Sequence, residues 1–138
     1  GVLGLLASAS LFLGLRAIGG NLMSALTALS FVCFGIAMIM AGVFALPNPL
    51  HYGFNIILAV LFTPLLGALA FKGGGAARWI VFAGFLAGFG ALTVNAGVGG
   101  IATRENFGWV ARVHGFIAFS TIAFLCYALL RAQPRRQT

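Results

Sequence analysis

Four long, nearly uninterrupted apolar runs constrain this chain more than any other feature of its sequence. They cover residues 22–46, 52–71, 79–98 and 109–130. A membrane-spanning α-helix needs about 20 predominantly apolar residues to cross roughly 30 Å of hydrocarbon. Transmembrane β-strands are shorter and alternate between apolar and polar side chains, unlike these runs. The sequence therefore predicts an all-α fold, a polytopic bundle of transmembrane helices.

A fifth apolar run, residues 2–15, is shorter than a full span. Either its helix begins upstream of residue 1, or the helix lies partly buried in protein. We favour the first and expect a sixth span at the missing N-terminal part. A signal peptide is the rival interpretation, but no basic stretch precedes the run. We expect residues 1–138 to form a single transmembrane helical domain with about five spans.

Turn-forming residues separate the runs at chemically sensible places. Pro47-Asn48-Pro49 follows the second run, and each proline removes a backbone donor and disfavours helix just before it. Lys72 and three glycines form the next break, and the glycine-rich stretch 97–105 precedes the last run. Pro64 lies inside the third run, where a kink is tolerated if neighbouring groups satisfy the freed carbonyl.

The composition excludes several classes of protein. Only 7% of the residues are charged and 62% are hydrophobic, whereas a soluble domain has about 25% charged residues. An ordinary cytosolic enzyme, a disordered chain and a disulfide scaffold are therefore ruled out. Cys33 and Cys126 lie inside apolar runs, where we expect small buried thiols rather than a disulfide. No Cys/His cluster has metal-ligand spacing, so no metal site is predicted.

The basic residues predict the orientation in the membrane. Alternating spans place six of them on one side: Arg16, Lys72, Arg78, Arg131, Arg135 and Arg136. Arg104 and Arg112 fall on the other side, beside Glu105. By the positive-inside rule, the tail 131–138 is cytoplasmic, and the chain is expected in a bacterial inner membrane. Because the basic residues lie in short turns between apolar runs, they indicate topology, and no nucleic-acid partner is predicted.

Small residues predict close helix packing. Gly84 and Gly88 form a GxxxG step, and Gly115 belongs to a similar seam in the last run. Such residues let two backbones approach in lipid, where water drives no association. The partner helix is either another helix of the same bundle or a helix of another subunit. The sequence alone leaves both open.

The chain from about residue 11 to residue 131 resembles a bacterial membrane family catalogued as domain of unknown function 998. Two motifs carry the resemblance: Gly42-Val43-Phe44 followed by Pro47-Asn48-Pro49 and His51, and Gly108-x-x-x-Arg112. The family more often has aspartate at the position of Asn48 and glutamate at that of Ala111. The resemblance implies roughly six spans and no known substrate or reaction.

Polar residues concentrate on the predicted outer side and form a candidate site. They are His51, Glu105, Arg112, His114 and Asn48. Polar groups inside membranes are costly and often functional, so convergence on an outward-facing pocket is one interpretation. In the other, His51 caps a loop, Arg112 reaches lipid headgroups or pairs with Glu105, and His114 bonds a carbonyl.

A pigment is the one cofactor that these residues admit, although none is predicted outright. His114 or His51 is a candidate ligand for haem or a chlorophyll-type macrocycle, and Gly115 leaves room for a flat ring beside His114. His51 is expected several ångströms above His114, which is awkward for ligation by both.

Catalysis is not expected. The chain has no aspartate and one glutamate, so paired-carboxylate chemistry is missing. We therefore predict a non-catalytic accessory or scaffold subunit of a larger membrane complex, with membrane lipids and other membrane subunits as partners. The alternative is a transporter, or a lipid- or small-molecule-binding protein, that uses the outward-facing His/Arg site.

Overall fold

The structure, a computed structural model, describes residues 1–18, 20–45 and 47–132, with backbone alone for residues 52–55 and 57. Every regular element in this part of the chain is helical, which confirms the all-α prediction. The predicted tail residues Arg135 and Arg136 lie outside the described residues. Cys33 and Cys126 are free thiols.

Five helical segments match the five apolar runs. They are α1 (Val2–Ala17), α2 (Leu22–Val43), η1 (Pro49–Phe62) continued by α3 (Thr63–Ala70), α4 (Gly75–Asn95) and α5 (Phe107–Ala132). A short 3₁₀ turn, η2 (Val98–Gly100), lies between the last two. The ends differ from the predicted ones by a few residues, as is usual for helix boundaries.

Local chemistry explains where α2 begins. The Asn21 side chain accepts a hydrogen bond from the Ser24 N–H, and the Ser24 hydroxyl accepts one from the Asn21 N–H, both at 3.3 Å. This reciprocal pair is a capping box, which satisfies two backbone donors at the helix start. The helix ends at Val43, ahead of the two prolines.

The third apolar run departs from the predicted single kinked helix. Residues 49–62 form a 3₁₀ helix, and α-helical geometry starts only at Thr63. Pro64 has no N–H, so the Val60 carbonyl lacks its usual donor four residues on and accepts instead from the Thr63 N–H. A 3₁₀ helix rises about 2.0 Å per residue against 1.5 Å in an α-helix. Its 14 residues therefore reach farther than an α-helix of equal length.

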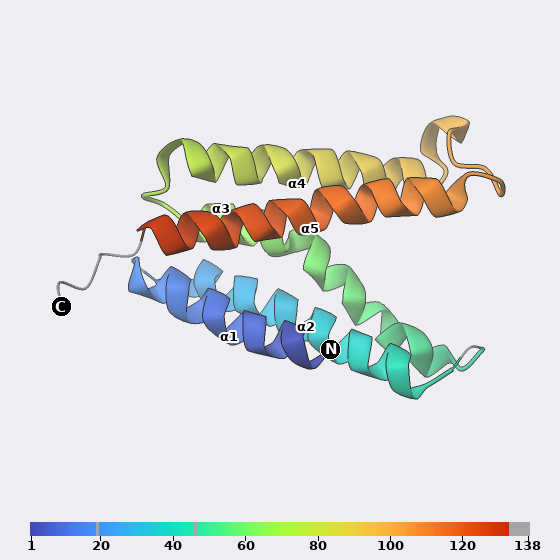
Figure 1. Cartoon of the computed structure of the whole chain (residues 1–138), viewed down its shortest axis with the longest axis horizontal. Helices are drawn as coiled ribbons and strands as arrows, with labels where there is room; N and C mark the ends of the chain where they lie inside the picture. Colours follow the sequence, from blue (N-terminus) through green and yellow to red (C-terminus); the bar gives the residue numbers. More distant parts are fainter. Residues whose placement is uncertain (19, 46, 133–138) are drawn as a thin grey trace.

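The segments alternate in direction and share a core at one end of the molecule. The α1–α2 turn, the α3–α4 turn and the C-terminal end of α5 lie at this end (Figure 1). Eleven buried residues form the core, ten from five helices and Phe71 directly after α3: Leu11, Leu15, Phe31, Ala68, Ala70, Phe71, Val81, Ile122, Leu125, Ala128 and Leu129.

Beyond the core the bundle divides into two arms. One arm contains α1 and α2 and the other α4 and α5, and they diverge toward the opposite end of the molecule (Figure 1). The 3₁₀ helix η1 packs against α2 and returns the chain from the tip of the α1–α2 arm to the core. The centre of the molecule is therefore the point at which the two arms separate.

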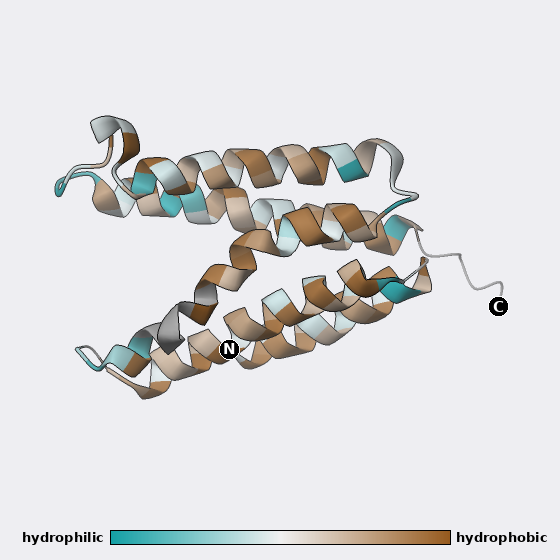
Figure 2. Cartoon of the chain, turned by 180° about the vertical axis from the view of Figure 1, so that it is seen from behind, coloured by the Kyte–Doolittle hydropathy of each residue, from teal (hydrophilic) through white to brown (hydrophobic). Residues whose placement is uncertain are grey.

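Among the described residues, three helices are long and apolar enough to cross a membrane: α2, α4 and α5. The helix α1 and the segment Leu58–Ala70 are apolar but shorter. Figure 2 shows that the hydrophilic residues gather mainly toward the ends of the helices. This distribution fits helices whose middles contact hydrocarbon.

Candidate functional site

An apolar cavity of about 380 Å³ lies where the two arms separate. Phe34 and Met38 of α2 form one wall, and α5 forms the other. The 3₁₀ helix contributes Leu58, Val60 and Leu61, and α4 contributes Leu92. Cavities of this size and apolar character are typical of small-molecule sites.

The wall formed by α5 follows helical spacing. His114, Ala118 and Ile122 lie four residues apart, and Gly115 and Phe119 make a parallel row. Gly115 and Ala118 have little or no side chain, whereas Phe119 and Ile122 are bulky. The small pair leaves the hollow, because a Cβ added at Gly115 would meet nothing within 4 Å.

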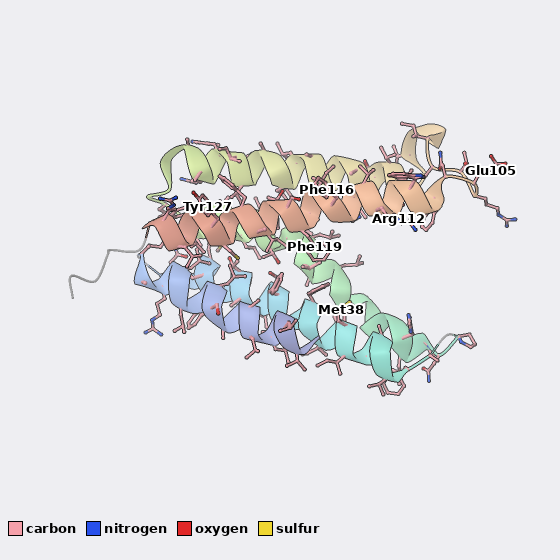
Figure 3. All side chains as sticks on the ribbon, in the orientation of Figure 1. Met38, Glu105, Arg112, Phe116, Phe119 and Tyr127 are labelled. Carbon is pink, nitrogen blue, oxygen red and sulfur yellow. The ribbon has the colours of Figure 1, made fainter. Side chains whose placement is uncertain are left out.

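The mouth of the cavity is formed by exposed apolar side chains. Met38, Leu58 and Phe119 are 41%, 51% and 47% exposed. Met38 of α2 and Phe119 of α5 lie on opposite arms (Figure 3). Phe34 and Phe119 connect the arms, with ring centroids 5.5 Å apart. An apolar molecule therefore reaches the cavity through a surface that is itself apolar.

His114 is the polar residue of this wall. Its Nε2 atom is buried and has no hydrogen-bond partner among the described residues. His114 also lines a second, much smaller hollow of about 10 Å³ that reaches Gly84 and Gly88 of α4. The predicted bond from His114 to a backbone carbonyl is not seen for Nε2. Buried polar nitrogens are normally paired, so this one calls for an explanation.

His51 and Asn48 lie at the start of η1, at the tip of the α1–α2 arm. His51 Nδ1 donates to the Phe44 carbonyl at 2.7 Å. The Asn48 side chain accepts from the Leu50 N–H at 2.9 Å and caps η1. Both side chains thus close the turn between α2 and η1, and for His51 this is the contact that the loop-capping interpretation expects.

Glu105 and Arg112 belong to the other arm. Glu105 is exposed in the loop before α5, and Arg112 is exposed on the first turns of that helix (Figure 3). No ion pair joins them in the described structure. The five residues of the predicted outer site are therefore divided between two arms, and only His114 lines the cavity.

The same division bears on the pigment hypothesis. His51 precedes Leu58 by seven residues, or about 14 Å of 3₁₀ rise, and Leu58 is the first η1 residue of the cavity wall. The structure does not bring the two histidines together for ligation of one ring. The described residues contain no group of three or more possible metal ligands. A macrocycle held by His114 alone stays a prediction.

The three packing glycines have different surroundings. A Cβ on Gly84 would lie 2.6 Å from Cγ2 of Thr121, so α4 and α5 pack closely there. A Cβ on Gly88 would lie 3.8 Å from Cγ2 of Ile117, an ordinary contact. Gly115 is not part of a helix contact but opens onto the cavity. The GxxxG step thus faces a helix of the same bundle.

Two contacts across the bundle were not foreseen from the sequence. Ser30 and Thr63 hydroxyls are hydrogen-bonded at 2.7 Å between α2 and the start of α3, and both are buried. Gly67 packs against Leu125 so closely that a Cβ would clash with its side chain. The sequence does show hydroxyl residues and glycines within its apolar runs, but it does not indicate that Ser30 contacts Thr63 or that Gly67 contacts Leu125.

Comparison of the chain with protein-family models, curated proteins and solved structures gives no match. The resemblance to domain of unknown function 998 therefore stays a prediction. The candidate site rests on the geometry alone.

Proposed function

We propose that this chain is an integral membrane protein that binds a small apolar molecule in the cavity between α2, η1 and α5. The cavity supports the proposal, because its volume of about 380 Å³ lies within the range of roughly 300–1,000 Å³ for ligand sites. Its mouth lies among exposed apolar side chains, so a ligand dissolved in the bilayer enters without crossing water. This proposal develops the small-molecule-binding alternative and moves its site from the outer surface to the centre of the bundle.

A non-catalytic role is part of the proposal. Glu105 is the one acid in the chain and lies in the loop before α5. The cavity is lined by apolar side chains and one histidine. General acid–base chemistry and hydrolysis usually need a second polar group within hydrogen-bond reach. Binding, storage or passage of an apolar molecule requires only a cavity of suitable shape and an entrance to it.

The cavity can be tested by filling it. Gly115→Leu adds a branched side chain to the hollow, and we expect it to lower the affinity for an apolar ring compound at least tenfold. Gly90→Leu is the matched control, because Gly90 also has open space around it and lines none of the described cavities. The probe is 1-methylnaphthalene, whose fluorescence is titrated in lipid nanodiscs with and without protein.

Subtraction of the protein-free signal corrects for partition into lipid. Equal thermal stability of the two leucine variants would exclude unfolding as the cause. Equal probe binding by wild type and Gly115→Leu would contradict a site in the cavity. No binding above the protein-free nanodiscs would contradict the function itself.

Membership of a larger membrane assembly is the second proposed function. It is supported by α4, in which Val81 and Gly88 are buried and several large apolar side chains are exposed. Trp79, Ile80 and Leu86 are each more than half exposed. Purification in a mild detergent followed by mass spectrometry tests this role. A stable stoichiometric partner would favour it, and a monomer with co-purifying ligand would favour the first proposal.

A further inference from the structure

The unpaired nitrogen of His114 indicates which kind of ligand the cavity takes. His114 Nε2 is buried without a partner among the described residues, and His114 lines the 380 Å³ cavity. A buried polar atom without a hydrogen bond is unfavourable. A ligand that supplies the missing hydrogen bond gains this interaction on binding, whereas a purely apolar ligand does not.

The surroundings of His114 favour an uncharged ligand. No charged side chain lines either of the two hollows that His114 borders. Transfer of an unpaired carboxylate or ammonium into such surroundings is strongly unfavourable. The hydrogen-bonding group of the ligand at His114 is therefore expected to be uncharged.

The chemistry of imidazole narrows this group further. Nε2 of a neutral histidine is a donor in one tautomer and an acceptor in the other. A carbonyl pairs only with the donor form, and an N–H only with the acceptor form. A hydroxyl donates and accepts, so it pairs with His114 in either tautomer.

The size and lining of the cavity indicate a ring. An apolar protein cavity of about 150 Å³ holds benzene, so the present cavity of about 380 Å³ has space for two fused rings. Phe34 and Phe119 in its wall provide the aromatic edges and faces against which a ring packs. The mouth at Met38 allows a longer apolar tail to extend into the lipid.

We propose that the cavity binds an uncharged, hydroxyl-bearing ring compound, and that the His114 ring turns on binding so that Nε2 faces the cavity and is hydrogen-bonded to the hydroxyl. This inference rests on the proposed function, namely that the cavity binds an apolar molecule. A competing explanation for the nitrogen is one ordered water in the adjoining hollow. That hollow measures about 10 Å³, the lower limit for a single water.

Two probes of equal shape test the inference. 1-Naphthol and 1-methylnaphthalene differ by a hydroxyl in place of a methyl group. We expect wild-type protein in nanodiscs to bind 1-naphthol about tenfold more tightly, after correction for partition into lipid, as one net hydrogen bond predicts. His114→Phe should remove this preference and leave the affinity for 1-methylnaphthalene nearly unchanged.

Asn95→Leu is the matched control, because Asn95 Oδ1 is the other buried side-chain polar atom without a partner among the described residues, and Asn95 does not line the cavity. This variant should keep the preference. Since the chain has two histidines, ¹⁵N-histidine NMR gives a direct second readout on unmutated protein. The His114 Nε2 resonance should move on addition of 1-naphthol and stay in place with 1-methylnaphthalene.

The outcomes separate the inference from the proposed function. If both probes bind equally and Gly115→Leu weakens both, the cavity binds apolar molecules but the hydroxyl inference is wrong, as it would be with a water on Nε2. A preference that persists in His114→Phe would also overturn the inference, because the hydroxyl would then be recognised elsewhere. If neither probe binds, the proposed function itself fails.

Discussion

Gly84 of α4 and Gly115 of α5, both predicted from the sequence to be packing glycines, have different roles in the structure. Gly84 lies against Thr121, a β-branched residue whose hydroxyl donates to the Ile117 carbonyl at 2.8 Å. That bond and the restricted χ1 angle of threonine hold the side chain in place, so it cannot yield to an added methyl group. By contrast, a Cβ on Gly115 would meet nothing within 4 Å, and Gly115 lines the cavity. Gly84 therefore allows α4 and α5 to pack closely, whereas Gly115 leaves open space at the cavity.

At this scale we predict unequal effects of two alanine substitutions in α4. Gly84→Ala should destabilise the protein by about 1–3 kcal/mol, the usual cost of overpacking, because its Cβ would lie 2.6 Å from Cγ2 of Thr121. Gly88→Ala should leave stability unchanged or raise it by up to about 1 kcal/mol, since its Cβ finds an ordinary contact at 3.8 Å and alanine favours the helix over glycine. Thermal unfolding in one detergent measures both. A Gly88 variant as unstable as the Gly84 variant would refute the packing described here.

At the scale of elements, the segment formed by η1 and α3 joins the two arms. It starts at the tip of the α1–α2 arm, passes the cavity and ends in the core. Ser30 of α2 and Thr63 at the start of α3 hold it in place through their 2.7 Å hydrogen bond. The Ser30 hydroxyl also donates to the Thr27 carbonyl at 2.8 Å, so the Thr63 hydroxyl is the donor between the helices.

This bond predicts an energetic coupling between Ser30 and Thr63. Interhelical hydrogen bonds in membrane proteins contribute about 0.6 kcal/mol on average and about 1.7 kcal/mol at most. In a double-mutant cycle, Ser30→Ala and Thr63→Val should show a coupling in this range. Ser10→Ala combined with Thr63→Val is the control and should be additive, because exposed Ser10 bonds only the Leu6 carbonyl of its own helix. Additivity of the first pair would show that the bond does not join the helices.

At the scale of the whole molecule, the two ends differ in charge and in aromatic contacts. The end with the core has Arg16, Lys72, Arg78 and Arg131 in its turns and at the end of α5. Three of these cations lie over aromatic rings: Arg16 over Phe12 at 5.8 Å, Arg78 over Trp79 at 5.6 Å and Arg131 over Tyr127 at 5.3 Å. Pairs of basic and aromatic residues are typical of the interface between membrane and water.

The charge difference predicts that the core end faces the cytoplasm. Single cysteines at Gly73, in the α3–α4 turn, and at Ile101, in the loop before α5, would mark the two ends in a background of Cys33→Ala and Cys126→Ala. A membrane-impermeant thiol reagent should label Ile101→Cys in intact spheroplasts and Gly73→Cys only in inverted vesicles. A Pro47→Cys variant at the tip of the α1–α2 arm should behave like Ile101→Cys. The reverse pattern would overturn the orientation.

The sequence by itself determined the fold class and the approximate helix positions, because both depend on local properties. Apolar runs of spanning length favour helices. Pro47 and Pro49 separate the second run from the third, and the glycines of residues 73–75 separate the third from the fourth. The same reasoning placed the kink near Pro64, although the 3₁₀ geometry before it was not foreseen.

The tertiary structure alone decided which residues meet. His51 and Arg112 were expected together because their spans end on the same side of the membrane, yet the arms carrying them diverge. Gly84 and Gly115 have similar sequence contexts, but the crossing of α4 and α5 puts one in a contact and leaves the other at a cavity. Helices with apolar residues all round have no single face that the sequence assigns to the interior. The unpaired nitrogen of His114 therefore emerges only when α2, η1 and α5 are placed around it, since burial is a property of the packed helices and not of the residue.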